Sequence, residues 1–223
     1  MADSAEIPRA TYRLQFHKGF SFDDAVRVLP YLQRLGISHI YCSPILRAGP
    51  GSLHGYDVVA HDEINPELGG ASGFERFSAA LQAHGLGQLL DLVPNHMGVF
   101  GADNAWWMDV LENGPASLYA HHFDIDWLPV NPDLQGKVLV PVLGDHYGDV
   151  LDSGQLVVSF EPEGGHLVLS YHEHRLPLDP CSYPRVLRRA LKALDPGPAS
   201  VALETLMDAF VGLPSTHARD RLA

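Results

Sequence analysis

The sequence contains few cysteines, few basic residues and no long hydrophobic run, and each shortage excludes a class of protein. Two cysteines among 223 residues do not make the disulfide framework of a small secreted domain. The 27 Asp and Glu outnumber the 15 Lys and Arg, for a formal net charge of -12. This charge argues against nucleic acid as a partner, because phosphate binding requires a basic surface. No apolar run approaches the ~20 residues of a membrane span, so we expect no spanning segment and no membrane partner.

The remaining composition is typical of a globular protein. With 46% hydrophobic and 19% charged residues, the chain can bury a core and is not expected to be disordered. Residues 1–6 lack the basic start and apolar core of a signal peptide. We therefore expect a cytoplasmic protein with a neutral or cationic ligand. Cys42 lies in an apolar run, where a buried, reduced thiol is expected.

Strand and helix patterns alternate through the first hundred residues. Residues 10–16, 37–45 and 88–93 are apolar or alternate polar with apolar side chains, and they predict three strands. Helical periodicity fills both intervals between them, and each interval is long enough for a parallel crossover. This β-α-β-α-β order predicts an α/β fold with a parallel sheet.

Short polar motifs predict where the two helices begin and end. Ser21 with Asp24 and Ser72 with Glu75 have the spacing of capping boxes. Pro30 interrupts the first helical pattern, so that helix either kinks there or gives way to a second helix that begins at Pro30. The expected helix stops are Gly36 and Gly85.

The pattern changes after residue 98. Residues 99–182 are rich in Gly, Pro, Trp, His and Asp, with β-like runs at 137–143, 155–160 and 166–171. We interpret them as an irregular β-rich insertion after the third strand. Helical periodicity returns at 183–194 and 201–211. The predicted organisation is three β/α units in residues 1–98, the insertion in 99–182 and a helical segment in 183–223.

Two polar clusters follow predicted strands. Asp91, Asn95 and His96 lie at and beyond the end of the third strand, where a (β/α)8 barrel carries its site. There Asp91 could hold a neighbouring cation, Asn95 brace the loop or ligate calcium, and His96 donate to a ligand hydroxyl. Alternatively, Asp91 caps the strand end and His96 is an ordinary surface residue.

Tyr56 and Asp57 form the second cluster, in a loop after the second strand. A tyrosine ring can stack on a pyranose, and a carboxylate can accept hydrogen bonds from its hydroxyls. Alternatively, Tyr56 packs in the core and Asp57 caps a turn, because motifs this short are unspecific.

Two further pairs of residues could belong to a metal or sugar site. His172 and His174 would lie on one face of a strand, but a metal site needs a third ligand, so we expect no metal and no cofactor. Trp106 and Trp107 could form a sugar platform or pack the core of the insertion.

Together these segments resemble the α-amylase superfamily of glycoside hydrolases. The resemblance is carried by residues 55–58 (Gly-Tyr-Asp-Val), 64–69 (Ile-Asn-Pro-Glu-Leu-Gly) and 91–96 (Asp-Leu-Val-Pro-Asn-His). Residues 8–16, 38–46 and 51–57 are more specific, and they are similar to the trehalose-forming branch of that superfamily. The match covers most of residues 8–190 and is strongest before residue 130.

The resemblance implies an enzyme whose substrate is a maltooligosaccharide. It implies an intramolecular transglycosylation that converts the reducing-end α-1,4 bond to an α,α-1,1 bond, on the N-terminal portion of a (β/α)8 TIM barrel. Tyr56 would stack on the sugar before the scissile bond, Asp57 would hold that sugar or an arginine, and His96 would bond its 6-hydroxyl. Asp91 and Asn95 would shape the pocket.

The sequence departs from the family pattern in one respect. The nucleophilic Asp and the acid Glu of that superfamily follow later strands, so we expect both beyond Ala223 and no catalytic residue within residues 1–223. The chain is then an N-terminal fragment that is inactive alone, with exposed strand edges that favour aggregation. Another α-amylase-type hydrolase or glucanotransferase, or a non-catalytic glucan-binding module, remains an alternative.

Overall fold

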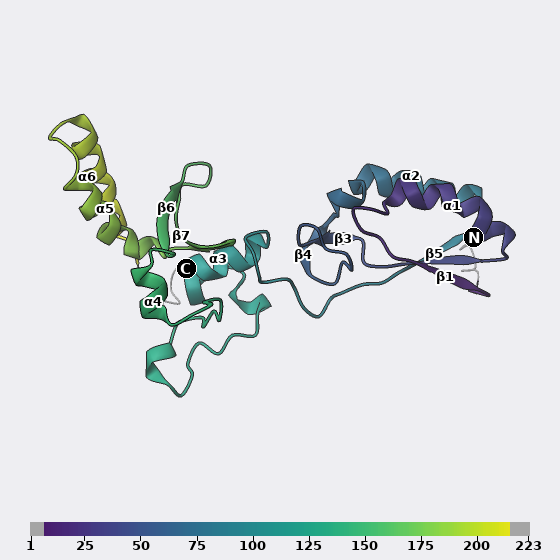
Figure 1. Ribbon diagram of the computed structural model, residues 1–223, viewed down its shortest axis with the longest axis horizontal. Helices are drawn as coiled ribbons and strands as arrows, with labels where there is room; N and C mark the ends of the chain where they lie inside the picture. Colours follow the sequence, from purple (N-terminus) through teal and green to yellow (C-terminus); the bar gives the residue numbers. More distant parts are fainter. Residues whose placement is uncertain (1–6, 215–223) are drawn as a thin grey trace. The chain divides into compact units, whose positions relative to one another are not determined.

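The computed structural model describes residues 7–214 and divides into two compact units, residues 1–99 and residues 100–223 (Figure 1). Within the described residues, no helix is both long and apolar enough to cross a membrane.

A parallel sheet organises the first unit. Its strands are β1 (Thr11–Leu14), β2 (His39–Cys42) and β5 (Gly87–Leu90), in the order β1-β2-β5. The register places Leu14 opposite Cys42 and Cys42 opposite Leu90, so the three carboxyl ends share one edge. The three predicted strands and the α/β class are confirmed, although each strand is shorter than expected.

Helices α1 (Phe22–Arg34) and α2 (Gly70–Ala83) lie along the same face of this sheet (Figure 1). The side chains between these layers form one apolar core centred on three phenylalanine rings, with centroid distances of 5.0 to 5.8 Å. Cys42 is fully buried in this core, as predicted, and desolvation raises the pKa of its thiol to about 11. The three rings belong to Phe16, Phe22 and Phe77.

The ends of α1 follow the sequence signals. The backbone N–H and the hydroxyl of Ser21 both donate to Asp24, at 2.9 and 2.8 Å, and these bonds lower the pKa of Asp24. Pro30 lies inside one continuous helix, so no second helix begins there. Beyond the helix, the N–H groups of Gly36 and Ile37 bond back to its last turn, and Gly36 has a left-handed φ of 87°. Gly85 ends α2 in the same way, with a φ of 63°.

The predicted start of α2 at Ser72 is wrong. The Asn65 side chain accepts from the Glu67 N–H at 2.9 Å and caps a 3₁₀ turn, Pro66–Leu68. Gly69, with a φ of 112°, then turns the chain into α2 at Gly70. Ser72 therefore lies within the first turn, because the preceding turn had already begun the helix.

A hairpin that the sequence did not predict follows β2. Its strands β3 (Leu46–Ala48) and β4 (Val58–Ile64) pair antiparallel. The predicted second strand, residues 37–45, is therefore too long, since the chain leaves the parallel sheet after Cys42. The loop between β3 and β4 contains Tyr56 and Asp57.

The second unit combines short helices with an antiparallel sheet. Strands β6 (Val157–Glu161), β7 (His166–Tyr171) and β8 (His174–Pro177) form a meander in the order β6-β7-β8. The predicted strands at 155–160 and 166–171 and the predicted helices at 183–194 and 201–211 are confirmed, with small shifts at their ends. The helices of this unit are α3 (Ala105–Asn113), α4 (Tyr147–Asp152), α5 (Tyr183–Leu191) and α6 (Pro198–Val211). Short 3₁₀ turns occur at Gly114–Ala116, Ala120–His122, Pro132–Leu134 and Pro180–Ser182.

The predicted strand at residues 137–143 is wrong. This segment has no regular structure, and the side chain of Leu139 is 74% exposed. Pro141 interrupts the run and cannot donate to a strand ladder. An apolar run alone therefore predicted a strand that does not form here.

Candidate functional site

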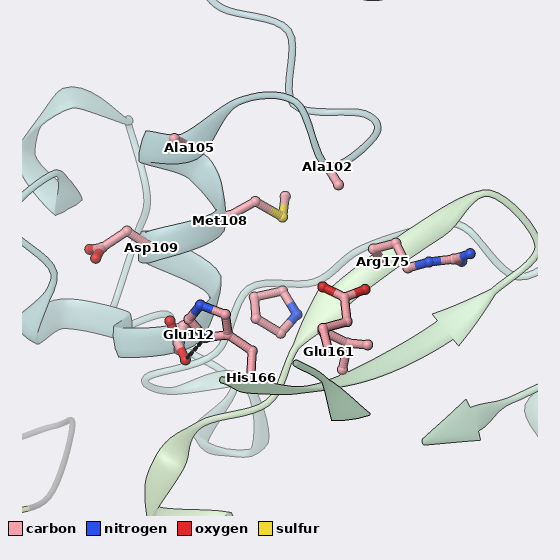
Figure 2. Close-up of a pocket in the computed structure, with 10 residues that line it drawn as sticks. Ala102, Ala105, Met108, Asp109, Glu112, Glu161, His166 and Arg175 are labelled. Atoms are coloured by element: carbon pink, nitrogen blue, oxygen red, sulfur yellow. Dashed lines mark hydrogen bonds and ion pairs between the residues drawn. The ribbon is translucent and has the colours of Figure 1, made fainter. Parts of the chain in front are cut away.

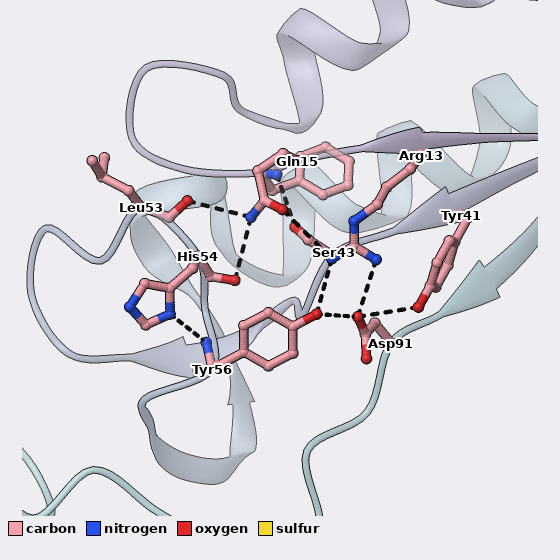
Figure 3. A network of polar contacts seen from close by, with 9 residues as sticks. Arg13, Gln15, Tyr41, Ser43, Leu53, His54, Tyr56 and Asp91 are labelled. Atoms are coloured by element: carbon pink, nitrogen blue, oxygen red, sulfur yellow. Dashed lines mark hydrogen bonds and ion pairs between the residues drawn. The ribbon is translucent and has the colours of Figure 1, made fainter.

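Tyr56 and Asp91 lie together although 35 residues separate them. Tyr56 is in the loop before β4, and Asp91 is the first residue after β5. The phenol of Tyr56 donates to Asp91 Oδ2 at 2.6 Å (Figure 3). The two clusters predicted from sequence therefore form one site at the carboxyl edge of the parallel sheet.

Arg13 and Tyr41 complete this contact, and neither was predicted from the sequence as a site residue. Arg13 Nη1 donates to Asp91 Oδ2 at 3.1 Å, and Arg13 Nη2 donates to the Tyr56 hydroxyl at 3.0 Å. Tyr41 lies opposite Arg13 on β2, and its hydroxyl donates to Asp91 Oδ2 at 3.2 Å (Figure 3). The sequence feature that could have identified them is a polar residue at corresponding positions of two neighbouring predicted strands. We refer to Arg13, Tyr41, Tyr56 and Asp91 as the strand-end network.

The network fixes the charge of its members. The hydrogen bond from Tyr56 lowers the pKa of Asp91, and the donors from Arg13 and Tyr41 act in the same direction. The same bond to the carboxylate raises the pKa of Tyr56. At neutral pH the site therefore holds an ionised carboxylate and a neutral phenol. Asp91 Oδ1 makes no hydrogen bond within residues 7–214, so it can accept from a ligand hydroxyl.

A second set of contacts holds the loop that carries Tyr56. Gln15 Nε2 donates to the carbonyls of Leu53 and His54, both at 3.3 Å. The Tyr56 N–H donates to His54 Nδ1 at 3.0 Å, and the two rings stack with centroids 6.1 Å apart. Gly55 has a φ of 76°, and a Cβ there would lie 3.0 Å from the Pro44 carbonyl. The loop therefore requires glycine at this position.

Asp57 faces its own loop. Its Oδ1 accepts from the Ser52 hydroxyl at 2.5 Å. His54 Nδ1 is 3.6 Å from the same oxygen, but Nδ1 already accepts from the Tyr56 N–H and so carries no proton to donate. Asp57 is therefore held by Ser52 rather than by an ion pair, and its side chain stays 39% exposed.

His96 and Asn95 lie at the exposed end of the segment after β5. His96 Nε2 pairs with the Tyr56 carbonyl at 3.0 Å, which requires a proton on Nε2. A neutral His96 then offers an acceptor to a ligand through Nδ1, whereas the sequence suggested a donor. The Asn95 side chain is exposed and makes no hydrogen bond within the part of the chain that the structure describes.

The other sequence candidates have local structural roles. His172, with a φ of 49°, lies in the turn between β7 and β8, so it shares no strand face with His174, contrary to the prediction. Trp106 stacks on Tyr119 with centroids 5.1 Å apart, and Trp107 packs on Phe123 at 5.0 Å. In the described residues, no three His, Cys, Asp or Glu side chains are grouped to hold a metal ion.

The second unit has a cleft of about 390 Å³, which the sequence did not predict (Figure 2). Helix α3 and the strands β6, β7 and β8 contribute side chains to it. A 2.8 Å contact joins Glu112 on α3 to His166 on β7. Acidic, basic and apolar side chains all contribute to its lining, so the lining does not favour one ligand class. The lining residues are Ala102, Ala105, Met108, Asp109, Glu112, Glu161, His166, Val168, Arg175 and Pro177.

Known proteins match this chain across both units. The family description "Alpha amylase, catalytic domain" matches residues 25–149. A Mycobacterium tuberculosis protein described as "Putative maltooligosyl trehalose synthase" is 44% identical over 171 residues, which are 70% of this chain and 22% of that protein. The intracellular maltogenic amylase of Bacillus subtilis is 35% identical over 115 residues, 52% of this chain and 19% of that protein.

A solved structure matches in fold as well. The maltooligosyltrehalose synthase of Arthrobacter ramosus is 42% identical with a TM-score of 0.67, and the match covers 77% of this chain and 21% of that one. This chain therefore spans about a fifth of the length of these relatives.

Proposed function

The chain belongs to the α-amylase family, and we propose that it is the N-terminal part of an enzyme that forms maltooligosyltrehalose. The observation that carries the proposal is the strand-end network, which joins Tyr56 to Asp91 at the carboxyl edge of the sheet. The 44% identity to a protein described as a trehalose-forming synthase supports this reaction over hydrolysis.

In this proposal, β1, β2 and β5 are the first three strands of a (β/α)8 barrel. Residues 99–182 are an insertion after the third strand. The helical segment predicted for residues 183–223 belongs to the same enzyme, and its residues 215–223 lie outside the described part of the chain. Active sites of such barrels lie at the carboxyl ends of the strands, which is where Asp91 follows β5. A cytoplasmic location remains a prediction.

The proposed reaction moves one glucose within its own chain. The reducing-end α-1,4 bond of a maltooligosaccharide breaks, and the released glucose rejoins through its anomeric hydroxyl in an α,α-1,1 bond. Retention at the anomeric carbon requires a nucleophilic carboxylate and a carboxylic acid about 5 Å apart. Asp91 already accepts from Arg13, Tyr41 and Tyr56 through Oδ2, so it supports the pocket. This chain spans about a fifth of the length of its relatives, and in this proposal the nucleophile and the acid belong to the part of the enzyme outside residues 1–223.

Each predicted site residue has a role in binding the sugar. Tyr56, 38% exposed, presents its ring to the pyranose before the scissile bond, and Asp57 accepts from the hydroxyls of that sugar. His96 bonds the 6-hydroxyl, with Nδ1 as acceptor when the ring is neutral. Asp91 and Asn95 shape the pocket, and Asp91 Oδ1 accepts from a sugar hydroxyl.

A binding experiment tests the sugar site in the chain as it is. Maltopentaose is titrated into the 223-residue protein and followed by NMR, with Tyr56→Ala beside Tyr31→Ala as the matched control. Tyr31 is an exposed tyrosine on α1. We expect Tyr56→Ala to weaken binding about tenfold, because the stacking face is lost, and Tyr31→Ala to leave it unchanged. Equal affinities for the two variants would reject Tyr56 as the sugar platform.

Product analysis tests the reaction. We expect the 223-residue chain to bind maltopentaose without turnover, and the DNA beyond codon 223 to encode further strands with an Asp and a Glu at their ends. The longer polypeptide should remove reducing ends without releasing much glucose. A rise in reducing ends would indicate an amylase-type hydrolase instead, and a genuine stop after codon 223 would favour a glucan-binding module.

A further inference from the structure

We propose that Arg13 is a positioning residue that fixes the ring of Tyr56 before a sugar binds. The inference rests on the proposed role of Tyr56 as the sugar platform. Arg13 reaches both partners of the Tyr56–Asp91 bond, with one terminal nitrogen on each. It therefore bridges β1 and the end of β5 to the loop between β3 and β4.

The geometry of this bridge is specific to arginine. Nη1 lies 3.1 Å from Asp91 Oδ2 while Nη2 lies 3.0 Å from the Tyr56 hydroxyl, so the planar guanidinium makes two bonds at once. The Tyr56 hydroxyl accepts from Arg13 and donates to Asp91, which fixes both its lone pair and its proton. A lysine ammonium is a point charge on a flexible stem and does not reproduce this planar fork.

The sheet in turn holds Arg13. Its Cζ lies 4.6 Å from the centroid of the Tyr41 ring, which is its register partner on β2. Gln15, two residues after Arg13 and just beyond the end of β1, lies beside it, with Arg13 Nη2 3.5 Å from Gln15 Oε1. Gln15 also donates to the carbonyls of Leu53 and His54. Gln15 thus anchors the loop at its main chain, and Arg13 anchors it at the Tyr56 hydroxyl.

The consequence for binding is preorganisation. An exposed tyrosine on a loop otherwise loses side-chain freedom when a sugar stacks on it, and that loss weakens binding. Here the hydroxyl, the backbone N–H and the carbonyl of Tyr56 each have a partner. Removal of Arg13 should therefore weaken binding through Tyr56, without loss of a direct contact to the sugar.

The test compares Arg13→Met and Arg13→Lys with Arg76→Met in the 223-residue chain. Arg76 is the matched control, because it also makes a forked ion pair, with Asp23 between α2 and α1, away from the strand-end network. Proteins labelled with ¹³C in tyrosine rings and aspartate carboxyls are titrated with maltopentaose and with acid. The readouts are the Tyr56 ring resonances, the titration midpoint of Asp91 and the affinity.

We expect Arg13→Met to shift the Tyr56 resonances, to raise the titration midpoint of Asp91 and to weaken maltopentaose binding about tenfold. Arg13→Lys should keep the Asp91 midpoint closer to wild type and still lose most of the affinity, because the charge remains and the fork is lost. Arg76→Met should change none of the three readouts.

Two results would overturn the inference. One is wild-type Tyr56 resonances and affinity in Arg13→Met; the other is full recovery of affinity in Arg13→Lys, which would reduce Arg13 to a charge. If the wild-type chain does not bind maltopentaose, the proposed sugar site fails. The resonance and midpoint readouts then still decide whether Arg13 positions Tyr56.

Discussion

The two units of this chain bury their side chains in different ways. In the first unit, Phe16, Phe22 and Phe77 meet between one layer of helices and one sheet, and all three are fully buried. In the second unit, buried tyrosines bond the backbone: the hydroxyl of Tyr171 accepts from the Gly144 N–H and that of Tyr183 from the Leu167 N–H, both at 2.9 Å.

The difference follows from the regularity of the segments. Alternating strands and helices bring whole apolar faces together, so one continuous core forms. Gly144 lies in an irregular segment, and Leu167 lies on β7 opposite Leu178, which is beyond the end of β8. No strand ladder satisfies either N–H, and a buried N–H needs a partner. A tyrosine supplies apolar area and that partner together. The first unit should therefore depend most on ring packing, and the second on hydroxyl groups.

The largest effect is expected from Phe77→Ala. The substitution removes a ring that lies 5.7 Å from Phe16 and 5.8 Å from Phe22, and large-to-small changes of this kind cost about 3–5 kcal/mol. Hydrogen exchange followed by mass spectrometry should show faster opening of peptides from α1 and α2. Tyr31→Ala, which truncates an exposed aromatic on α1, should leave those peptides almost unchanged. Similar exchange in both variants would mean that the three-ring core does not dominate the first unit.

Tyr183→Phe removes a single oxygen atom and tests whether the second unit depends on its buried hydroxyl groups. Loss of the hydroxyl leaves the buried Leu167 N–H without its partner, which costs about 1–3 kcal/mol. We expect faster exchange in peptides that contain β7, while Tyr147→Phe, at a residue that is 63% exposed, has no effect. Unchanged exchange at β7 would show that ring packing alone holds this unit, as in the first.

Two glycine substitutions are expected to have the smallest effects, and to change the free energy of unfolding in opposite directions. Gly85 in the first unit has a φ of 63°, and Gly148 in the second lies in α4 without a positive φ; an added Cβ meets nothing within 4 Å at either site. Gly85→Ala should destabilise by about 1 kcal/mol, because a side chain is strained in the left-handed region. Gly148→Ala should stabilise by about 0.5 kcal/mol through helix propensity. Urea unfolding measures the stability of both variants. A change in the same direction in both would contradict the expectation that backbone conformation decides the effect.

Prediction from sequence succeeded where one local signal was sufficient. The capping pair at Ser21 and the stops at Gly36 and Gly85 act within a single turn, and the structure has them as predicted. The start at Ser72 failed because the preceding turn, capped by Asn65, already led into the helix. Residues 137–143 failed because an apolar run forms a strand only when a neighbouring strand pairs with it.

The residues of the site divide in the same way into those that the sequence predicted and those that it did not. Tyr56, Asp91 and His96 stand out in the sequence because each belongs to a polar cluster after an apolar run. Arg13 and Tyr41 do not, since each is a single polar residue within a strand. Their role depends on the register that places β1 beside β2, and on the loop that brings Tyr56 to Asp91.

By itself, the sequence determined the α/β order of the first unit, the ends of several helices and the polar residues at the strand ends, because periodicity and capping are local properties. Only the tertiary structure decided which of those residues meet. The hairpin of β3 and β4 carries Tyr56 to Asp91, and the parallel register brings Arg13 to both. Contacts between residues 35 to 78 positions apart depend on how the chain packs, and no local pattern encodes them.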